Sequence, residues 1–88
     1  MNTLFEKTFA NDIKKIADKT LKEEIKKTTL SVEQALTLKE IPRLLKLKGY
    51  RIHYRIRVGK YRIGVSIEND LVTFERFAHR KDFYKIFP

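Results

Sequence analysis

The chain of 88 residues contains no cysteine and no long hydrophobic run. Without cysteine, the protein has no disulfides, no thiolate nucleophile and no cysteine-ligated zinc. No apolar stretch approaches the roughly 18 residues of a spanning helix, and the N-terminus lacks the apolar core of a signal peptide. We therefore expect a cytoplasmic protein with no membrane partner.

Several chemical motifs are also missing. The sequence has no P-loop, no glycine-rich dinucleotide motif and no nucleophile elbow. The four acidic residues after position 42 are dispersed, and the two histidines have no carboxylate pair beside them. Such a set does not build a metal site. We expect neither a metal nor a small-molecule cofactor.

The scarcity of acidic residues in the second half is the most informative feature. Residues 1–42 hold eight basic and seven acidic side chains, whereas residues 43–88 hold twelve and four. A basic excess concentrated in one segment is typical of proteins that bind a polyanion. The alternative is a generally basic protein kept soluble by its charge, but the asymmetry between the halves argues against it.

The first half has the pattern of a helical scaffold. Residues 3–9 are expected to form a short strand, and apolar side chains then recur at helical spacing from Phe9 to Ala17. A second helix is expected to begin at Thr20, because Glu23 completes a capping box. Its buried stripe would contain Leu21, Ile25, Thr28, Val32 and Leu36.

The second half changes to a period of two. Pro42 ends any preceding helix, and residues 41–49 are expected to be a connector whose leucines tuck beneath a sheet. Apolar and basic residues alternate from Tyr50 onward. Gly59-Lys60 predicts a type II′ hairpin turn, because the glycine comes first.

The return strand continues the alternation to Glu68, and Asn69-Asp70 predicts the next turn. Residues 71–78 are expected to form a third strand, and residues 82–87 a single helical turn or a closing extension. Strands joined by tight turns are antiparallel. The chain is therefore predicted to be one α+β domain, residues 1–88, with an N-terminal strand, an α-helical hairpin and a three-stranded antiparallel meander. Both helices would cover one face of a single sheet.

The hairpin turn fixes the predicted register, which places Arg57 opposite Arg62 and Arg55 opposite Gly64. Like charges directly opposite each other destabilise a sheet, so an external anion is expected to bind there. Guanidinium groups match phosphate bidentately, which favours a phosphodiester. The alternative is a solvated cationic face with arginine stems lying over apolar surface. The basic face would carry Arg51, His53, Arg55, Arg57 and Arg62.

The C-terminal segment adds groups that could move protons. His79 could act as a general acid or base, although a hydrogen-bonded structural histidine is an equal alternative. Tyr54 and Tyr61 fall on the apolar face and are expected in the core. Tyr84 lies beyond the last strand, where its ring is free to stack on a base.

Three segments together resemble the RelE/ParE toxin superfamily of type II toxin–antitoxin modules. They are Leu47-Lys48-Gly49, Tyr54-Arg55-Ile56-Arg57-Val58-Gly59-Lys60-Tyr61-Arg62-Ile63 and His79-Arg80-Lys81-Asp82-Phe83-Tyr84-Lys85. The resemblance implies a RelE-like fold and a ribosome-dependent endoribonuclease. RelE-like members cut mRNA in the ribosomal A site without a metal, by attack of the 2′-hydroxyl on the adjacent phosphate, leaving a 2′,3′-cyclic phosphate.

The resemblance also implies residue roles. Arg62 would bind the phosphate, Arg80 would stabilise the transition state, and Tyr84 would be the C-terminal tyrosine of the site. RelE has lysines where this chain has Arg55 and Arg57. Because arginine stays charged, these two are expected to clamp phosphate, and general-base duty moves to Tyr84 or His79. Further phosphate contacts are expected from Arg51, Lys60 and Lys81.

The superfamily further implies two partners. One is mRNA in the ribosomal A site, and the other is an acidic, partly helical antitoxin that covers the basic face and displaces the region of Tyr84. Two alternatives remain open at this point. One is a ParE-like inhibitor of DNA gyrase, and the other is a catalytically inactive RNA-binding homologue.

Overall fold

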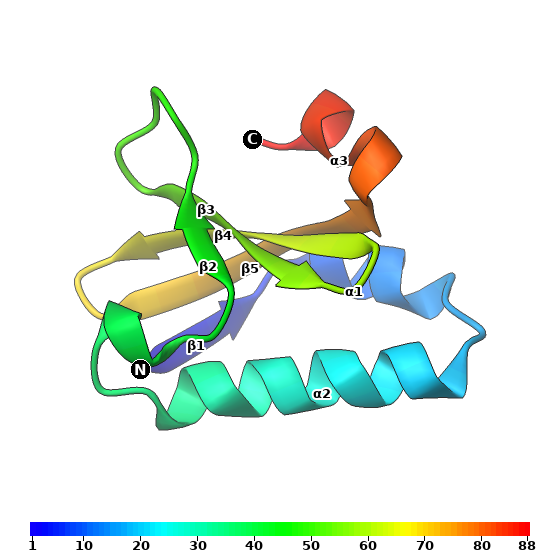
Figure 1. Ribbon diagram of the computed structural model, residues 1–88, viewed down its shortest axis with the longest axis horizontal. Helices are drawn as coiled ribbons and strands as arrows, with labels where there is room; N and C mark the ends of the chain where they lie inside the picture. The colour runs from blue at the N-terminus through cyan, green and yellow to red at the C-terminus, as the bar shows by residue number, and fades with distance from the viewer.

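The computed structural model describes residues 1–88, which fold into a five-stranded sheet with helices on both faces (Figure 1). In chain order the elements are β1 (Asn2–Phe5), α1 (Lys7–Lys14), α2 (Lys19–Gln34), the 3₁₀ turn η1 (Leu38–Glu40), β2 (Leu44–Lys46), β3 (His53–Val58), β4 (Tyr61–Glu68), β5 (Leu71–His79) and α3 (Arg80–Ile86). The strand order is β1-β5-β4-β3-β2, and only β1 and β5 pair in parallel. No helix is both long and apolar enough to cross a membrane.

The structure confirms the predicted α+β class and the antiparallel meander, which is β3, β4 and β5. The predicted hairpin register is also confirmed, with Arg57 opposite Arg62. In its turn only Gly59 has a positive φ, 58°, as a type II′ turn requires. Asn69 and Asp70 both have positive φ, which is the type I′ geometry that joins β4 to β5.

The N-terminal half differs from prediction at element ends. The predicted cap Thr20 is wrong, because α2 begins at Lys19 and Asp18 caps it by accepting hydrogen bonds from the backbone N–H groups of Thr20 and Leu21. Leu36 was expected to be buried, yet it lies beyond the end of α2 and is 82% exposed. The first strand also ends earlier than predicted, at Phe5.

The predicted connector at residues 41–49 contains a strand. Leu44–Lys46 forms β2, the edge strand that pairs with β3 and places Leu45 opposite Arg55. Three residues are too few to show an alternating pattern, so the sequence did not reveal this strand. Leu45 is 53% exposed rather than tucked beneath the sheet.

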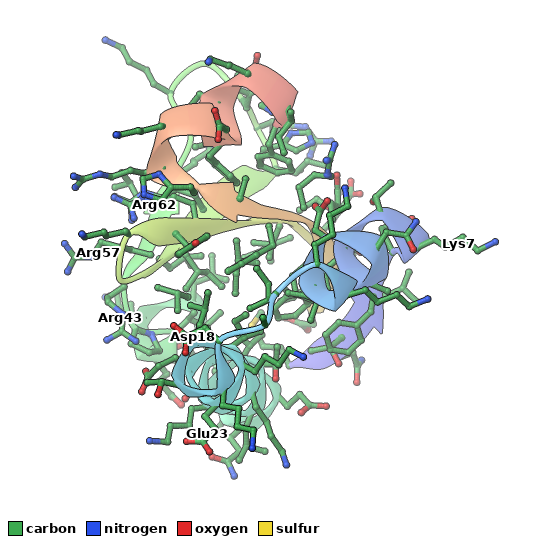
Figure 2. The ribbon with its side chains drawn as sticks, turned by 90° about the vertical axis from the view of Figure 1, so that its right-hand side faces the viewer. Lys7, Asp18, Glu23, Arg43, Arg57 and Arg62 are labelled. Atoms are coloured by element: carbon green, nitrogen blue, oxygen red, sulfur yellow. The ribbon has the colours of Figure 1, made fainter.

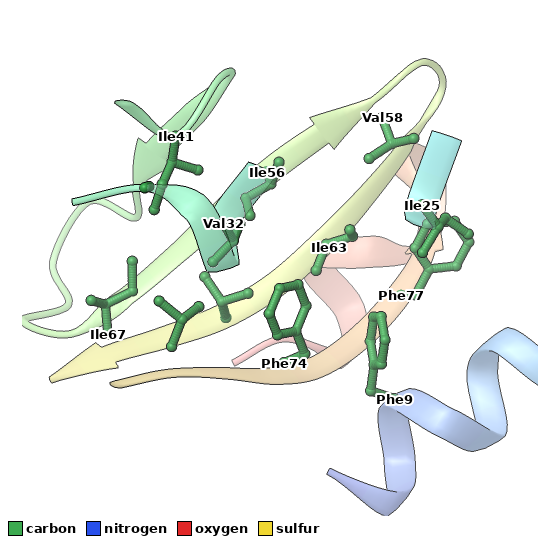
Figure 3. Packing of buried hydrophobic residues seen from close by; sticks show 13 residues of the cluster. Phe9, Ile25, Val32, Ile41, Ile56, Val58, Ile63, Ile67, Phe74 and Phe77 are labelled. Carbon is green, nitrogen blue, oxygen red and sulfur yellow. The ribbon is translucent and has the colours of Figure 1, made fainter. Parts of the chain in front are cut away.

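The main core lies between the sheet and the first two helices (Figure 3). Its fully buried side chains are Val32, Ile56, Ile63, Val65, Val72 and Phe74. Tyr54 and Tyr61 pack against this core, as predicted. A second, smaller cluster of Leu47, Phe83 and Phe87 fixes α3 on the opposite face of the sheet. We had expected no helix on that face.

Asp12 of α1 holds the end of β5 in place. Its carboxylate accepts hydrogen bonds from Arg76 Nε at 2.9 Å, from Arg76 Nη2 at 3.3 Å and from the backbone N–H of Phe77 at 2.9 Å. The hydrogen bonds that Arg76 donates to the Asp12 carboxylate raise the pKa of Arg76. The arginine of β5 is therefore committed to an ion pair with α1.

Replacing Asp12 with alanine should lower the free energy of unfolding by about 2–3 kcal/mol, because three hydrogen bonds are lost and a partly buried charge is left unpaired. Asp82→Ala is the control, since that carboxylate is exposed and pairs only with Lys85 at 3.8 Å. Its effect should stay below about 0.5 kcal/mol. Urea denaturation measures both, and equal effects of the two substitutions would contradict this account.

Candidate active site

Arginines from three elements gather where the β3–β4 turn meets α3. Antiparallel pairing places Arg57 directly opposite Arg62, and Arg55 lies two residues away on the same face. The backbone N–H of Arg80 donates to the carbonyl oxygen of Lys60 at 2.8 Å, which ties the first residue of α3 to the hairpin turn. Side chains far apart in the sequence thereby become neighbours.

Arg62 is the centre of this cluster. Its Nη1 donates to the carbonyl oxygens of Gly59 at 3.0 Å and Tyr61 at 2.9 Å, so its position is fixed by the turn. Burial lowers the pKa of Arg62, and the charge of Arg55 lowers it further, while Tyr84 acts in the opposite direction. Arg57 and Arg80 make smaller contributions of the same sign as Arg55.

The cluster has no acidic partner. The four ion pairs of the molecule are Glu24–Lys27, Arg51–Glu68, Asp12–Arg76 and Asp82–Lys85. Figure 2 shows Arg62, Arg57 and Arg43 one below the other on a single side of the molecule. Uncompensated guanidinium groups held this close together favour the binding of an anion with several oxygens.

The C-terminal helix is held where the ring of Phe87 packs directly on the backbone of Gly64 in β4. Phe83 and Phe87 are buried against Leu47, whereas Tyr84 is 59% exposed. A Cβ atom added to Gly64 would lie 2.6 Å from the ring of Phe87. Glycine at this position of β4 is therefore what allows α3 to sit over the sheet.

The structure gathers five of the predicted site residues, Arg55, Arg57, Arg62, Arg80 and Tyr84. The exposed side chains of Lys60 and Lys81 begin at the adjoining turn and in the first turn of α3.

The structure places His79 and Arg51 elsewhere. His79 caps α3 by accepting a hydrogen bond at Nδ1 from the N–H of Lys81, and its ring makes a T-shaped contact with the ring of Tyr61. It thus lies on the Tyr61 side of the sheet, away from Arg62. Arg51 pairs with Glu68 at 3.3 Å, near the other end of the hairpin.

Arg43 belongs to the basic surface but was missed in the sequence. Its Nε donates to the carbonyl oxygen of Arg57 at 3.0 Å, and its own carbonyl oxygen accepts from Arg57 N–H and from Arg55 Nη1. The mixture of basic and apolar residues after Pro42 was the available signal. Phe87 was also missed, although an interior strand glycine such as Gly64 often marks a close approach.

Comparison with known proteins identifies the family. A family model described as the ParE toxin of type II toxin–antitoxin systems matches residues 4–84. The chain belongs to the RelE/ParE toxin superfamily. It is 38% identical over 89 residues to toxin RelE3 of Methanocaldococcus jannaschii, across the whole length of both chains. The resemblance predicted from the three motifs is therefore confirmed.

Solved structures of the superfamily share the fold. The RelB–RelE antitoxin–toxin complex of Methanococcus jannaschii contains a chain that is 39% identical, with a TM-score of 0.79, and the match covers 97% of this chain and 99% of that one. RelE in the RelE–RelB complex of Pyrococcus horikoshii is 18% identical with a TM-score of 0.72, over 90% and 93% of the two chains. The predicted RelE-like architecture is thus confirmed.

Proposed function

We propose that this chain is the toxin of a type II module and an endoribonuclease that cuts mRNA in the ribosomal A site. The observation that carries the proposal is the arginine cluster, in which Arg62 of β4 meets Arg80 and Tyr84 of α3. Arg55 and Arg57 of β3 lie beside them, and none of the arginines has an acidic partner. Membership of the superfamily supports the same conclusion.

The chemistry suits the groups present. The 2′-hydroxyl oxygen attacks the adjacent phosphorus, the bond to the 5′ oxygen breaks, and the products carry a 2′,3′-cyclic phosphate and a 5′-hydroxyl. Arg62 and Arg80 bind the non-bridging oxygens and stabilise the negative charge that builds on them in the transition state. Arg55 and Arg57 hold the backbone of the strand.

In this proposal Tyr84 takes the proton of the attacking 2′-hydroxyl and the departing 5′ oxygen receives one in return. Arginine stays protonated and is a poor base. The His79 ring lies on the Tyr61 face of the sheet, and its Nδ1 is committed to capping α3. Tyr84 is the remaining side chain of the cluster that can give or accept a proton.

Tyr84→Phe should therefore slow cleavage by about 100-fold or more, with RNA affinity changed less than about twofold, because the ring remains and only the hydroxyl is lost. Tyr50→Phe, at another exposed tyrosine, is the matched control and should cleave as the parent does. Single-turnover cleavage on programmed ribosomes measures both rates. A Tyr84→Phe variant with parental activity would remove the tyrosine from the proton chemistry.

We also infer that an acidic antitoxin segment silences the toxin. It would cover the arginine cluster and displace α3, which carries Tyr84. Residues 43–88, with twelve basic and four acidic side chains and so a net charge of +8, supply the complementary charge. The antitoxin–toxin complexes of the relatives from Methanococcus jannaschii and Pyrococcus horikoshii support such a partner.

Two assays on purified protein test the activity. Primer extension on mRNA bound to ribosomes should reveal cuts within the A-site codon, while DNA supercoiling by gyrase should be unaffected. The second assay addresses the alternative of a gyrase inhibitor, since the matching family model is named for ParE. Inhibited gyrase with intact mRNA would overturn the proposed function. An inactive RNA-binding homologue would leave both substrates unchanged.

A further inference from the structure

A cleft at the β2 edge of the sheet lies beside the catalytic cluster. It has a volume of about 250 Å³ and is lined by Arg43, Leu44, Leu45, Arg55 and Arg57. Three of its five lining residues are arginines, and none of them forms an ion pair. The cleft is separate from the turn that fixes Arg62, although Arg55 acts on both, since its charge also lowers the pKa of Arg62.

The backbone around this cleft is held in an uncommon conformation. Arg43 has a φ of 60°, in the left-handed region that residues other than glycine adopt rarely. In this conformation its main chain and side chain form three hydrogen bonds with Arg57 and Arg55, all between 3.0 and 3.3 Å. The three arginines are thus locked together rather than spread by their repulsion.

One donor atom of Arg55 remains without an acceptor. Arg55 Nε is buried and makes no hydrogen bond. Buried donors are rarely left unpaired, so the Arg55 guanidinium keeps hydrogen-bonding capacity that the protein does not use. Leu45, directly opposite Arg55 in the register, adds exposed apolar surface against which a ribose or base can pack.

The geometry points to a second phosphate subsite formed by Arg43, Arg55 and Arg57. It binds the RNA phosphodiester next to the one that Arg62 holds, and Leu45 contacts the intervening nucleoside. Arg43 would contact only this second phosphate, whereas Arg55 lies close to both. Substituting Arg43 therefore tests the second subsite alone. This inference rests on the proposed function for the identity of the polyanion as RNA.

The test compares short RNAs that differ by one phosphodiester. A trinucleotide and a dinucleotide, both 2′-O-methylated to prevent cleavage, are titrated into the full chain by NMR. The parent should bind the trinucleotide about tenfold more tightly, as one additional charge-assisted contact predicts. Arg43→Gly should lose most of this difference and leave dinucleotide affinity unchanged, because glycine adopts the left-handed φ without strain.

Arg51→Ala is the matched control, because it removes one exposed arginine far from the cleft and should keep the difference. Arg43→Gly should also reduce the slope of log affinity against log salt by about 0.7 for the trinucleotide. A parent that binds both RNAs equally, or an Arg43→Gly variant that keeps the full difference, would overturn the subsite. A failure of the proposed nuclease activity is distinguishable from this. It would leave mRNA intact on ribosomes while the parent still bound the trinucleotide more tightly than the dinucleotide.

Discussion

Arg62→Ala should lower the rate of mRNA cleavage by about 100- to 1000-fold, the usual effect of removing one preorganised donor to a transition-state oxyanion. Arg62 is the arginine of the cluster that the turn holds in place, through the carbonyl oxygens of Gly59 and Tyr61, so the other arginines do not reproduce its fixed position. Single-turnover cleavage on ribosomes programmed with mRNA measures the effect, and growth arrest on expression should disappear with it.

Stability should move little in the same variant. The substitution removes two hydrogen bonds to the turn but also relieves repulsion from Arg55 and Arg57, so the unfolding free energy should stay within about 1 kcal/mol of the parent. Arg51→Ala is the control and should cleave at the parental rate. Parental cleavage by Arg62→Ala, in a protein that still folds, would show that the cluster is not the catalytic centre.

Gly64→Ala should reduce cleavage by about 100-fold although residue 64 carries no chemistry, because misplacing a catalytic group by about 1 Å has effects of this size. The added methyl group would meet three atoms of the Phe87 ring within 2.8 Å, so Phe87 must move. Since Phe87 and Phe83 anchor α3, Tyr84 and Arg80 move with them. Overpacking should also lower stability by about 1–3 kcal/mol.

A double-mutant cycle isolates this mechanism. In a Phe87→Ala background the clash is absent, so adding Gly64→Ala should change cleavage and stability much less than it does in the parent. Ser66→Ala, two residues along β4 on the same face, is the matched control and should leave cleavage unchanged. Equal effects of Gly64→Ala in both backgrounds would mean that it acts otherwise than through α3.

The hairpin was predictable because its determinants are local. Alternation from Tyr54 to Ile67 sets which side chains face the core, and Gly59 sets the turn, so the pairing of Arg57 with Arg62 follows. Membership of the superfamily followed from motifs on that same hairpin and on α3. These features depend on residues that are close together in the chain.

The rest of the site depends on tertiary contacts. The helix α3 is seven residues long and is held by Phe87 on Gly64, a contact between elements that the sequence pattern does not connect. Likewise, β2 exists because three residues pair with β3, and Arg43 adopts its positive φ through hydrogen bonds with that strand.

A bulge explains why the position of His79 was not predictable. The pairing of β4 with β5 shifts between Gly64 and Val65, so Gly64 pairs with Arg76 while Val65 pairs with Phe74. The skipped residue changes the phase of alternation along β5. Period-two reasoning alone therefore does not assign the face of any residue after the bulge, and His79 lies on the Tyr61 side.

Mapping both RNA ends after incubation with A-site-programmed ribosomes tests the central claim most directly. Cuts confined to the A-site codon are predicted, with a 2′,3′-cyclic phosphate on the upstream fragment and a 5′-hydroxyl on the downstream fragment. They should be made by the parent and by Arg51→Ala but not by Arg62→Ala. Intact mRNA with the parent, or cuts that Arg62→Ala makes equally well, would contradict the assignment of the arginine cluster as a ribonuclease site.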